Sequence, residues 1–188
     1  MPDAKKTQMV RVATLPIHDM LHAVWEAGEL VFGQSAIGAA GPEFIETWWR
    51  AALSDPAYKG HPALQNESDL KWMLPIVIHM DGGEVFNNVE FYNWSWSVAT
   101  VQGPALDKCY PILSLPAYCM LDPDIKHEVM ERVGHFIGWC VSLTRHGIGP
   151  LRDYYNDAHP PRSFRANLAG KPIAGPWKAC FAGFKVGW

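Results

Sequence analysis

The sequence lacks the features of several protein classes. None of its 188 residues falls in a run of about 18 uninterrupted apolar residues, the length a transmembrane helix needs. No apolar segment directly follows the charged N-terminus, so we expect no secretory signal and an intracellular protein, cytoplasmic or nuclear. The four cysteines form no C-x-x-C pair, which argues against a zinc ribbon or a thioredoxin-like site.

The composition is that of one globular domain. With 48% hydrophobic and 19% charged residues, the chain can bury a substantial core. We therefore predict a single domain over 1–188, with a helical part over 1–70 and a sheet with a long helix over 71–188. Nine Trp residues exceed what such a core normally needs. Most should be buried, and any surplus would form a Trp-rich surface for a protein partner.

Charge is distributed unevenly along the chain. Residues 145–188 carry seven basic and two acidic side chains, a net charge of +5, whereas residues 1–144 carry nine basic and 17 acidic ones, a net charge of -8. This asymmetry predicts a partner that prefers the basic end.

Helical periodicity predicts two N-terminal helices. Apolar residues recur at helical spacing over 14–32, where Thr14 suits the N-cap. A second helix is expected over 43–53, with Pro42 and Glu43 in its first turn. The segment 56–70 has the composition of a loop.

Three strands are expected to form a small mixed or antiparallel sheet in an α+β fold. The run 75–81 reads as a central strand, with Ile76 and Ile78 on one face and Val77 covered on the other, and Gly82 and Gly83 are expected to turn the chain after it. Residues 89–98 alternate with period two, and 108–120 is a further run that its prolines limit to an edge or a short strand.

A long helix near 123–146 follows, opened by Asp122 and stopped by Gly147. We predict that it packs on the sheet through one apolar face, and that its charged side chains face water. The inward residues are Ile125, Val129, Val133 and Phe136, and the outward ones are Lys126, Glu128 and Arg132. A long loop over 147–176 and an apolar segment complete the chain, and loops of this length are usually functional or disordered.

Asp81 is the first candidate site residue. A carboxylate at the end of a buried strand is either a turn former, since Asp before Gly is a common turn signal, or a ligand for Mg²⁺ or Mn²⁺. The sequence leaves both interpretations open.

The order strand, strand, strand, helix, apolar segment resembles the opening half of a ribonuclease-H-like nuclease or transposase domain. The runs IHMDG (78–82), YNWSWS (92–97) and ACFAGF (179–184) also resemble transposon-like reading frames of dinoflagellate genomes. The resemblance implies that Asp81 binds a divalent metal and shares it with a carboxylate at the end of the strand after the helix. Residues 181–188 carry no carboxylate.

A second candidate metal site lies on the first helix. His18, His22 and Glu26 fall at i, i+4 and i+8, and the segment 18–22 is similar to the H-E-x-x-H motif with Asp19 in place of the Glu. An ordinary solvated helix face explains the same spacing.

The basic C-terminal loop is the third candidate. It interleaves cations with aromatic rings, the combination that single-stranded nucleic acid binding requires. The candidate residues are Arg152, Tyr154, Tyr155, Arg162, Phe164, Arg165 and Lys171. A solvated loop, or a contact with an acidic protein, explains the same composition.

These features lead to three hypotheses. The first is a binding or scaffolding module derived from a transposase-like nuclease, without catalytic activity as an isolated chain. The second is an active divalent-metal-dependent nuclease in which Asp81, Glu84 and Glu90 supply the acids. The third is a structural subunit of a larger protein assembly.

Overall fold

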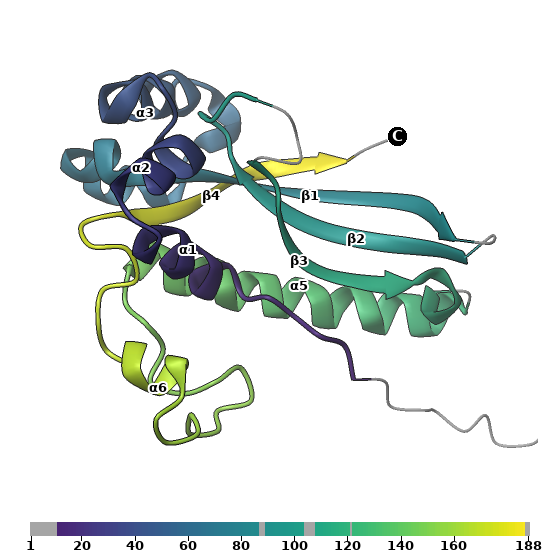
Figure 1. Cartoon of the computed structure of the whole chain (residues 1–188). Helices are drawn as coiled ribbons and strands as arrows, with labels where there is room; N and C mark the ends of the chain where they lie inside the picture. The colour runs from purple at the N-terminus through teal and green to yellow at the C-terminus, as the bar shows by residue number, and fades with distance from the viewer. Residues whose placement is uncertain (1–10, 87–88, 104–107, 121, 187–188) are drawn as a thin grey trace, which may run out of the picture.

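The computed structural model describes residues 11–86, 89–103, 108–120 and 122–186, the side chains of 64–67, 84–86, 89 and 186 apart (Figure 1). Its elements, in chain order, are α1 (Ile17–Glu26), α2 (Glu29–Phe32), the π-helical turn η1 (Gly33–Ile37), α3 (Gly41–Leu53), the 3₁₀ helices η2 (Pro56–Tyr58) and η3 (Pro62–Trp72), β1 (Met73–Phe86), β2 (Val89–Val98), β3 (Tyr110–Pro116), the 3₁₀ helix η4 (Ala117–Met120), α5 (Pro123–His146), α6 (Phe164–Leu168) and β4 (Lys178–Val186).

The four strands form one mixed sheet in the order β3-β2-β1-β4, which confirms the predicted α+β fold. β1 pairs antiparallel with β2, and β2 pairs antiparallel with β3. β4 pairs parallel with β1. Because parallel neighbours need a long crossover connection, α5 and the loop after it carry the chain back to the start of β1.

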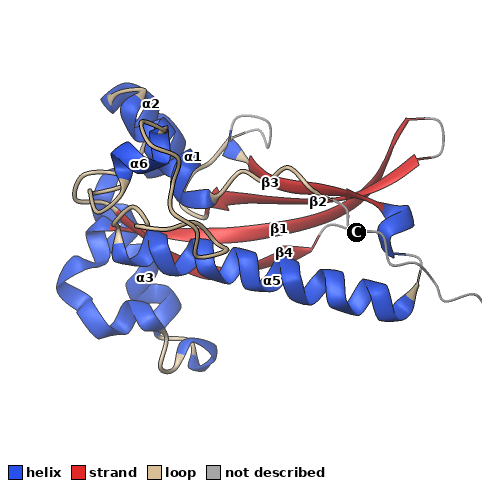
Figure 2. Ribbon diagram, turned by 90° about the horizontal axis from the view of Figure 1, so that it is seen from below, coloured by secondary structure: helices blue, strands red, loops and turns tan. Residues whose placement is uncertain are grey.

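Helices cover one face of the sheet and one end of the opposite face. Figure 2 shows α5 running along the sheet, and α1 packs against α5. The elements α2, η1 and α3 gather at the N-terminal end of β1, so no helix of the described residues covers the far half of the opposite face (Figure 1). None of the described helices is long and apolar enough to cross a membrane.

β1 is longer than the sequence suggested. Instead of turning after Asp81, the chain stays extended to Phe86, and Gly82 and Gly83 pair with Tyr92 and Phe91 of β2. The Tyr92 ring lies in van der Waals contact with the position that a Gly82 side chain would take. Both glycines thus continue the strand, and the predicted turn at this point is wrong.

The N-terminal region also departs from prediction. The first helix begins at Ile17, after an N-cap at Pro16, and is interrupted at Gly28, which has a φ of 104°. This backbone conformation is strained for any residue except glycine, so the single predicted helix becomes two. The expected loop over 56–70 is largely 3₁₀ helix, because Asp55 and His61 cap η2 and η3 with their side chains.

α5 has the predicted bounds, and Gly147 ends it in the left-handed conformation, with a φ of 73°. Of the residues predicted to face the sheet, Val129, Val133 and Phe136 pack against the core. The residues predicted to face water, Lys126, Glu128 and Arg132, are exposed. Ile125 is the exception: it is 44% exposed, because the first turn of α5 does not reach the core. The residues of α5 that are fully buried are Ile137, Cys140 and Thr144.

The core includes the predicted central strand and most of the Trp rings. Ile76 and Ile78 are completely buried on one face of β1, as predicted, and Val77 is half-buried on the other. Trp49 is also buried, and its indole Nε1 donates a hydrogen bond to the Met73 carbonyl at 2.6 Å. Every Trp in the described part of the chain is buried or half-buried, so those residues form no Trp-rich surface.

Candidate functional site

Asp81 lies on the uncovered half of the sheet. Strand alternation turns Ile76 and Ile78 toward the core and His79 and Asp81 the other way. The cross-strand partners on this side are also polar, because β2 alternates polar residues with Trp and Val. We call this surface the open face, and it consists of His79, Asp81, Asn93, Ser95, Ser114 and Lys185, with the buried Ser97 at its edge.

His79 of the open face has a hydrogen-bond partner on the neighbouring strand. Its Nε2 lies 2.7 Å from the Ser97 Oγ. Partial burial lowers the pKa of His79, and the nearby cations Lys185 and Lys108 lower it further. The imidazole is therefore neutral at pH 7, and the distance suits a base beside a nucleophile. No carboxylate of the described residues bonds to His79, so the third group of a catalytic triad is missing.

The metal ligands that the resemblance implies do not assemble among the described residues. β4 lies beside β1, as a shared metal would require, but the residue opposite His79 on the open face is Lys185. Glu90 is three positions from Asn93, the partner of Asp81, so alternation places Glu90 on the other face. The Glu84 side chain lies outside the described residues. In the part of the chain that the structure describes, no three His, Cys, Asp or Glu side chains converge on a metal position.

The three residues of the second candidate metal site, His18, His22 and Glu26, lie in different environments. His18 is completely buried, and burial lowers its pKa to about 4. Neither ring nitrogen of His18 has a hydrogen-bond partner, and the ring packs edge-on against Trp139. The Nδ1 of His22 lies 2.6 Å from the Ile173 carbonyl oxygen, whereas Glu26 is exposed.

Asp19, which the sequence suggested only as a substitute for a catalytic Glu, has a structural partner. Its Oδ2 accepts a hydrogen bond from the Arg165 Nε at 2.7 Å. This ion pair ties α6 to α1 across 146 residues. Arg165 therefore has a structural role, which sets it apart from the other basic residues predicted to bind nucleic acid.

The predicted loop over 147–176 is an ordered structure. Asp153 Oδ1 accepts hydrogen bonds from the backbone N–H groups of Tyr155 and Asp157, and the Arg152 guanidinium donates to the Asn156 carbonyl at 2.9 Å. At the base of the loop, a Cβ on Gly149 would overlap the Leu168 carbonyl, so only glycine fits there. These contacts fix the backbone of the loop around Tyr155.

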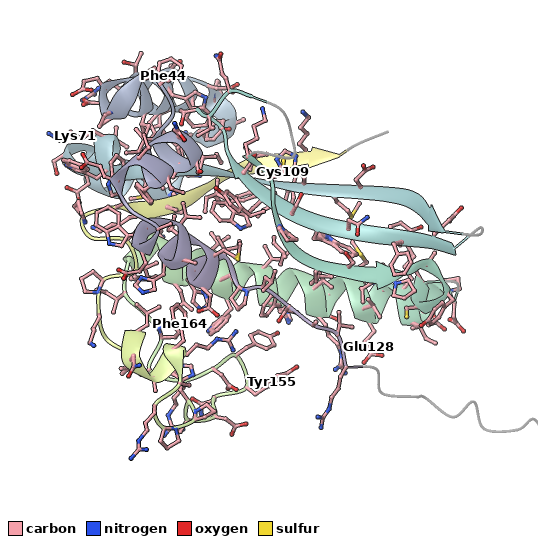
Figure 3. All side chains as sticks on the ribbon, viewed as in Figure 1. Phe44, Lys71, Cys109, Glu128, Tyr155 and Phe164 are labelled. Carbon is pink, nitrogen blue, oxygen red and sulfur yellow. The ribbon has the colours of Figure 1, made fainter. Side chains whose placement is uncertain are left out.

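The two neighbouring tyrosines have different roles. Tyr154 packs edge-on against Phe136 and Trp139 of α5, with ring centroids 5.4 and 5.6 Å apart, so it anchors the loop. Tyr155 is 80% exposed and projects from the loop below α5 (Figure 3). The predicted stacking role therefore suits Tyr155 and not Tyr154. Phe164 is half-exposed, with its ring 5.3 Å from that of His22.

The basic residues of the C-terminal segment do not form one surface. Lys178 pairs with Asp69, Lys185 lies on the open face, and Arg145 lines a cavity beside α5. The exposed groups that remain on the loop are Arg152, Tyr155, Arg162, Phe164 and Lys171, which we call the loop surface. In Figure 1, α6 and the loop before it lie below α1 and α5, on the side of α5 away from the sheet.

Comparison with protein-family models, with curated proteins and with solved structures finds no match to this chain.

Proposed function

We propose that this protein is a non-catalytic binding module built on half of a ribonuclease-H-like, transposase-derived domain, and that it binds single-stranded nucleic acid through the loop surface. The observation that carries the ancestry is the parallel pairing of β4 with β1 after the α5 crossover. Strands whose carboxylates share a metal must be neighbours, and these two strands are neighbours.

The chemistry beside Asp81 supports the proposed lack of catalysis. Two-metal phosphoryl transfer needs clustered oxygen ligands. The described β4 residue on the same face is Lys185, whose amine repels a divalent cation. A single exposed carboxylate with a neighbouring amine is a poor site for Mg²⁺ or Mn²⁺.

The binding role is supported by the loop surface. Arg162 and Lys171 are exposed, and neither has an ion-pair partner among the described residues. Tyr155 adds an exposed ring on which a base can stack. Because Asp153 already orders the loop, binding costs little conformational entropy.

The experiment measures binding and cleavage of labelled single-stranded DNA and RNA. Tyr155→Ala should weaken binding by about 1 to 3 kcal/mol, the usual value of one stacked base. The matched control is Tyr118→Ala, which removes a ring that is 66% exposed on η4, away from the loop. Equal effects of the two variants would contradict the assignment of the loop surface.

The same samples test the alternative function. With Mg²⁺ or Mn²⁺ present, the wild-type chain should leave the labelled strands intact. Turnover that disappears in Asp81→Asn and persists in Asp124→Asn, a change at another exposed carboxylate, would establish the active nuclease and reject the non-catalytic proposal.

A further inference from the structure

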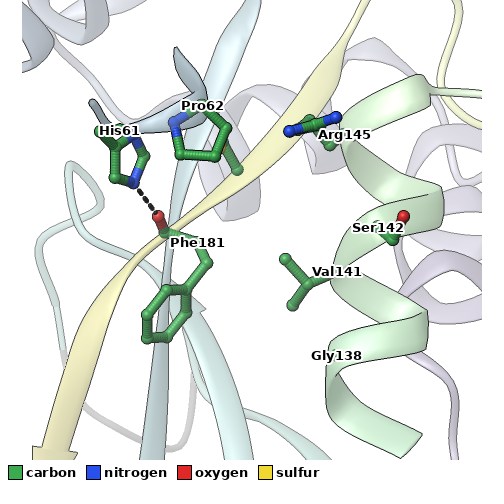
Figure 4. Close-up of a pocket in the computed structure, with 8 residues that line it drawn as sticks. His61, Pro62, Gly138, Val141, Ser142, Arg145 and Phe181 are labelled. Carbon is green, nitrogen blue, oxygen red and sulfur yellow. Dashed lines mark hydrogen bonds between the residues drawn. The ribbon is translucent and has the colours of Figure 1, made fainter. Parts of the chain in front are cut away.

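A cavity of about 320 Å³ lies between η3, α5 and β4 (Figure 4). Apolar side chains form much of its wall: Pro62 from η3, Val141 from α5 and Phe181 from β4. A volume of this order falls at the lower end of the range of small-molecule sites. The cavity shares no residue with the loop surface or the open face.

Arg145 supplies the permanent charge of this cavity. It is half-buried in the last turn of α5, and its side chain extends toward β4 (Figure 4). Arg132 and Arg165 each pair with a carboxylate, but Arg145 has no such partner within the described ranges. A half-buried guanidinium beside apolar walls is therefore available to an anion from outside.

The other polar groups of the wall are either neutral or engaged. Burial raises the pKa of the Cys180 thiol, and the nearby Arg145 only partly offsets this shift, so the thiol is protonated at pH 7. The His61 Nε2 lies 2.7 Å from the Phe181 carbonyl oxygen. Neither group competes for the guanidinium.

The cavity is not a place where another strand can join the sheet. Beside it, the carbonyl of Phe181 is engaged by His61, and the Tyr58 hydroxyl donates a hydrogen bond to the Ala182 carbonyl at 2.7 Å. Side chains thus cover the edge of β4 that an added strand would need. The geometry favours a compact ligand recognised by side chains.

We propose that the cavity binds a small organic anion, with a carboxylate or phosphate group on Arg145 and an apolar body against Pro62, Val141 and Phe181. A guanidinium binds a carboxylate or a phosphate through two parallel hydrogen bonds, which is why we expect the ligand to carry one of these groups. The apolar walls explain why the anion should carry a hydrophobic body.

Two glycines of α5 provide a matched pair of variants. A Cβ at Gly138 or at Gly134 meets no atom within 4 Å, and only Gly138 lines the cavity. Replacing either by Leu raises the helix propensity of α5 to the same extent. Gly138→Leu should fill the cavity, whereas Gly134→Leu should leave it open.

Benzoate and phenyl phosphate are the test probes, with benzyl alcohol as the uncharged control, each titrated into the full chain at low salt and followed by NMR of the Val141 methyl groups. We expect saturable binding of at least one anion. Arg145→Gln should weaken it about tenfold or more, since the loss of a charged hydrogen-bonded pair has this magnitude. Gly138→Leu should weaken it about tenfold or more as well, because the new side chain occupies the space of the ligand. Gly134→Leu and Arg132→Gln should leave binding unchanged, and the tighter probe identifies the preferred anionic group.

Three results would overturn the proposal. The first is no saturable shift at Val141 with either anion up to about 10 mM, a concentration that detects even weak sites. The second is equal binding of benzyl alcohol. The third is equal affinity in the Gly138→Leu and Gly134→Leu variants.

Discussion

Arg165 Nε lies 2.7 Å from Asp19 Oδ2, and this ion pair joins the loop that bears Tyr155 to the first helix. Asp19 is largely buried, whereas Arg165 remains partly exposed. The other Asp19 oxygen, Oδ1, is buried without a hydrogen-bond partner, and it lies 3.5 Å from His18 Nε2. The ion pair with Arg165 therefore offsets the cost of burying the Asp19 carboxylate.

Arg165→Gln should destabilise the fold by about 1 to 2 kcal/mol, because it leaves Asp19 charged and poorly solvated, a cost reduced by the partial exposure of Arg165. Urea unfolding measures the change. Arg132→Gln removes an exposed i, i+4 pair with Glu128 and should cost less than about 0.5 kcal/mol. Equal costs for the two variants would show that the Asp19 pair has no special role.

His18 should make the protein acid-sensitive. Burial lowers its folded-state pKa to about 4, below its ordinary value of 6.5, so the unfolded chain binds the proton more tightly. The free energy of unfolding should therefore be highest above pH 6.5 and should fall between pH 6.5 and 4, by at most about 3 kcal/mol from this group.

His18→Phe, which keeps a ring beside Trp139, should flatten that pH dependence. His135→Gln, at an exposed position of α5, should preserve it. Urea unfolding from pH 4 to 8 provides the measurement. An unchanged slope in His18→Phe would mean that other groups cause the acid sensitivity.

The burial pattern predicts different costs for two isoleucines. Ile78 is completely buried in β1, so Ile78→Ala should cost about 2 to 5 kcal/mol in the free energy of unfolding. Ile125 is exposed in the first turn of α5, and Ile125→Ala should cost less than about 0.5 kcal/mol. A large loss at Ile125 would indicate a helix register different from the one described.

The fold was predicted well where short sequence signals, such as helix caps, determine the structure locally. The Asp122 cap and Gly147 define α5 to the residue, because both act within one helical turn. Gly82 and Gly83 were misleading, since glycine occurs both in turns and within strands, and the sequence around them does not show that they pair with Tyr92 and Phe91 of β2.

The candidate sites depended on contacts between distant residues, which sequence spacing does not encode. Helical spacing placed His18 and His22 on one face but could not show that the core covers one and the Ile173 carbonyl engages the other. Likewise, nothing in the sequence distinguishes the anchoring Tyr154 from the exposed Tyr155, because the difference arises from packing against α5.

The salt dependence of single-stranded DNA binding shows whether the loop surface contacts phosphates. If Arg152, Arg162 and Lys171 contact phosphates, a plot of log affinity against log salt should have a slope of about -2, from roughly -0.7 per contact. Arg162→Gln should make that slope shallower by about 0.7, whereas Arg132→Gln, which removes the same charge from α5, should leave it unchanged. No binding at low salt, or a slope that both variants change equally, would contradict nucleic-acid binding by the loop surface.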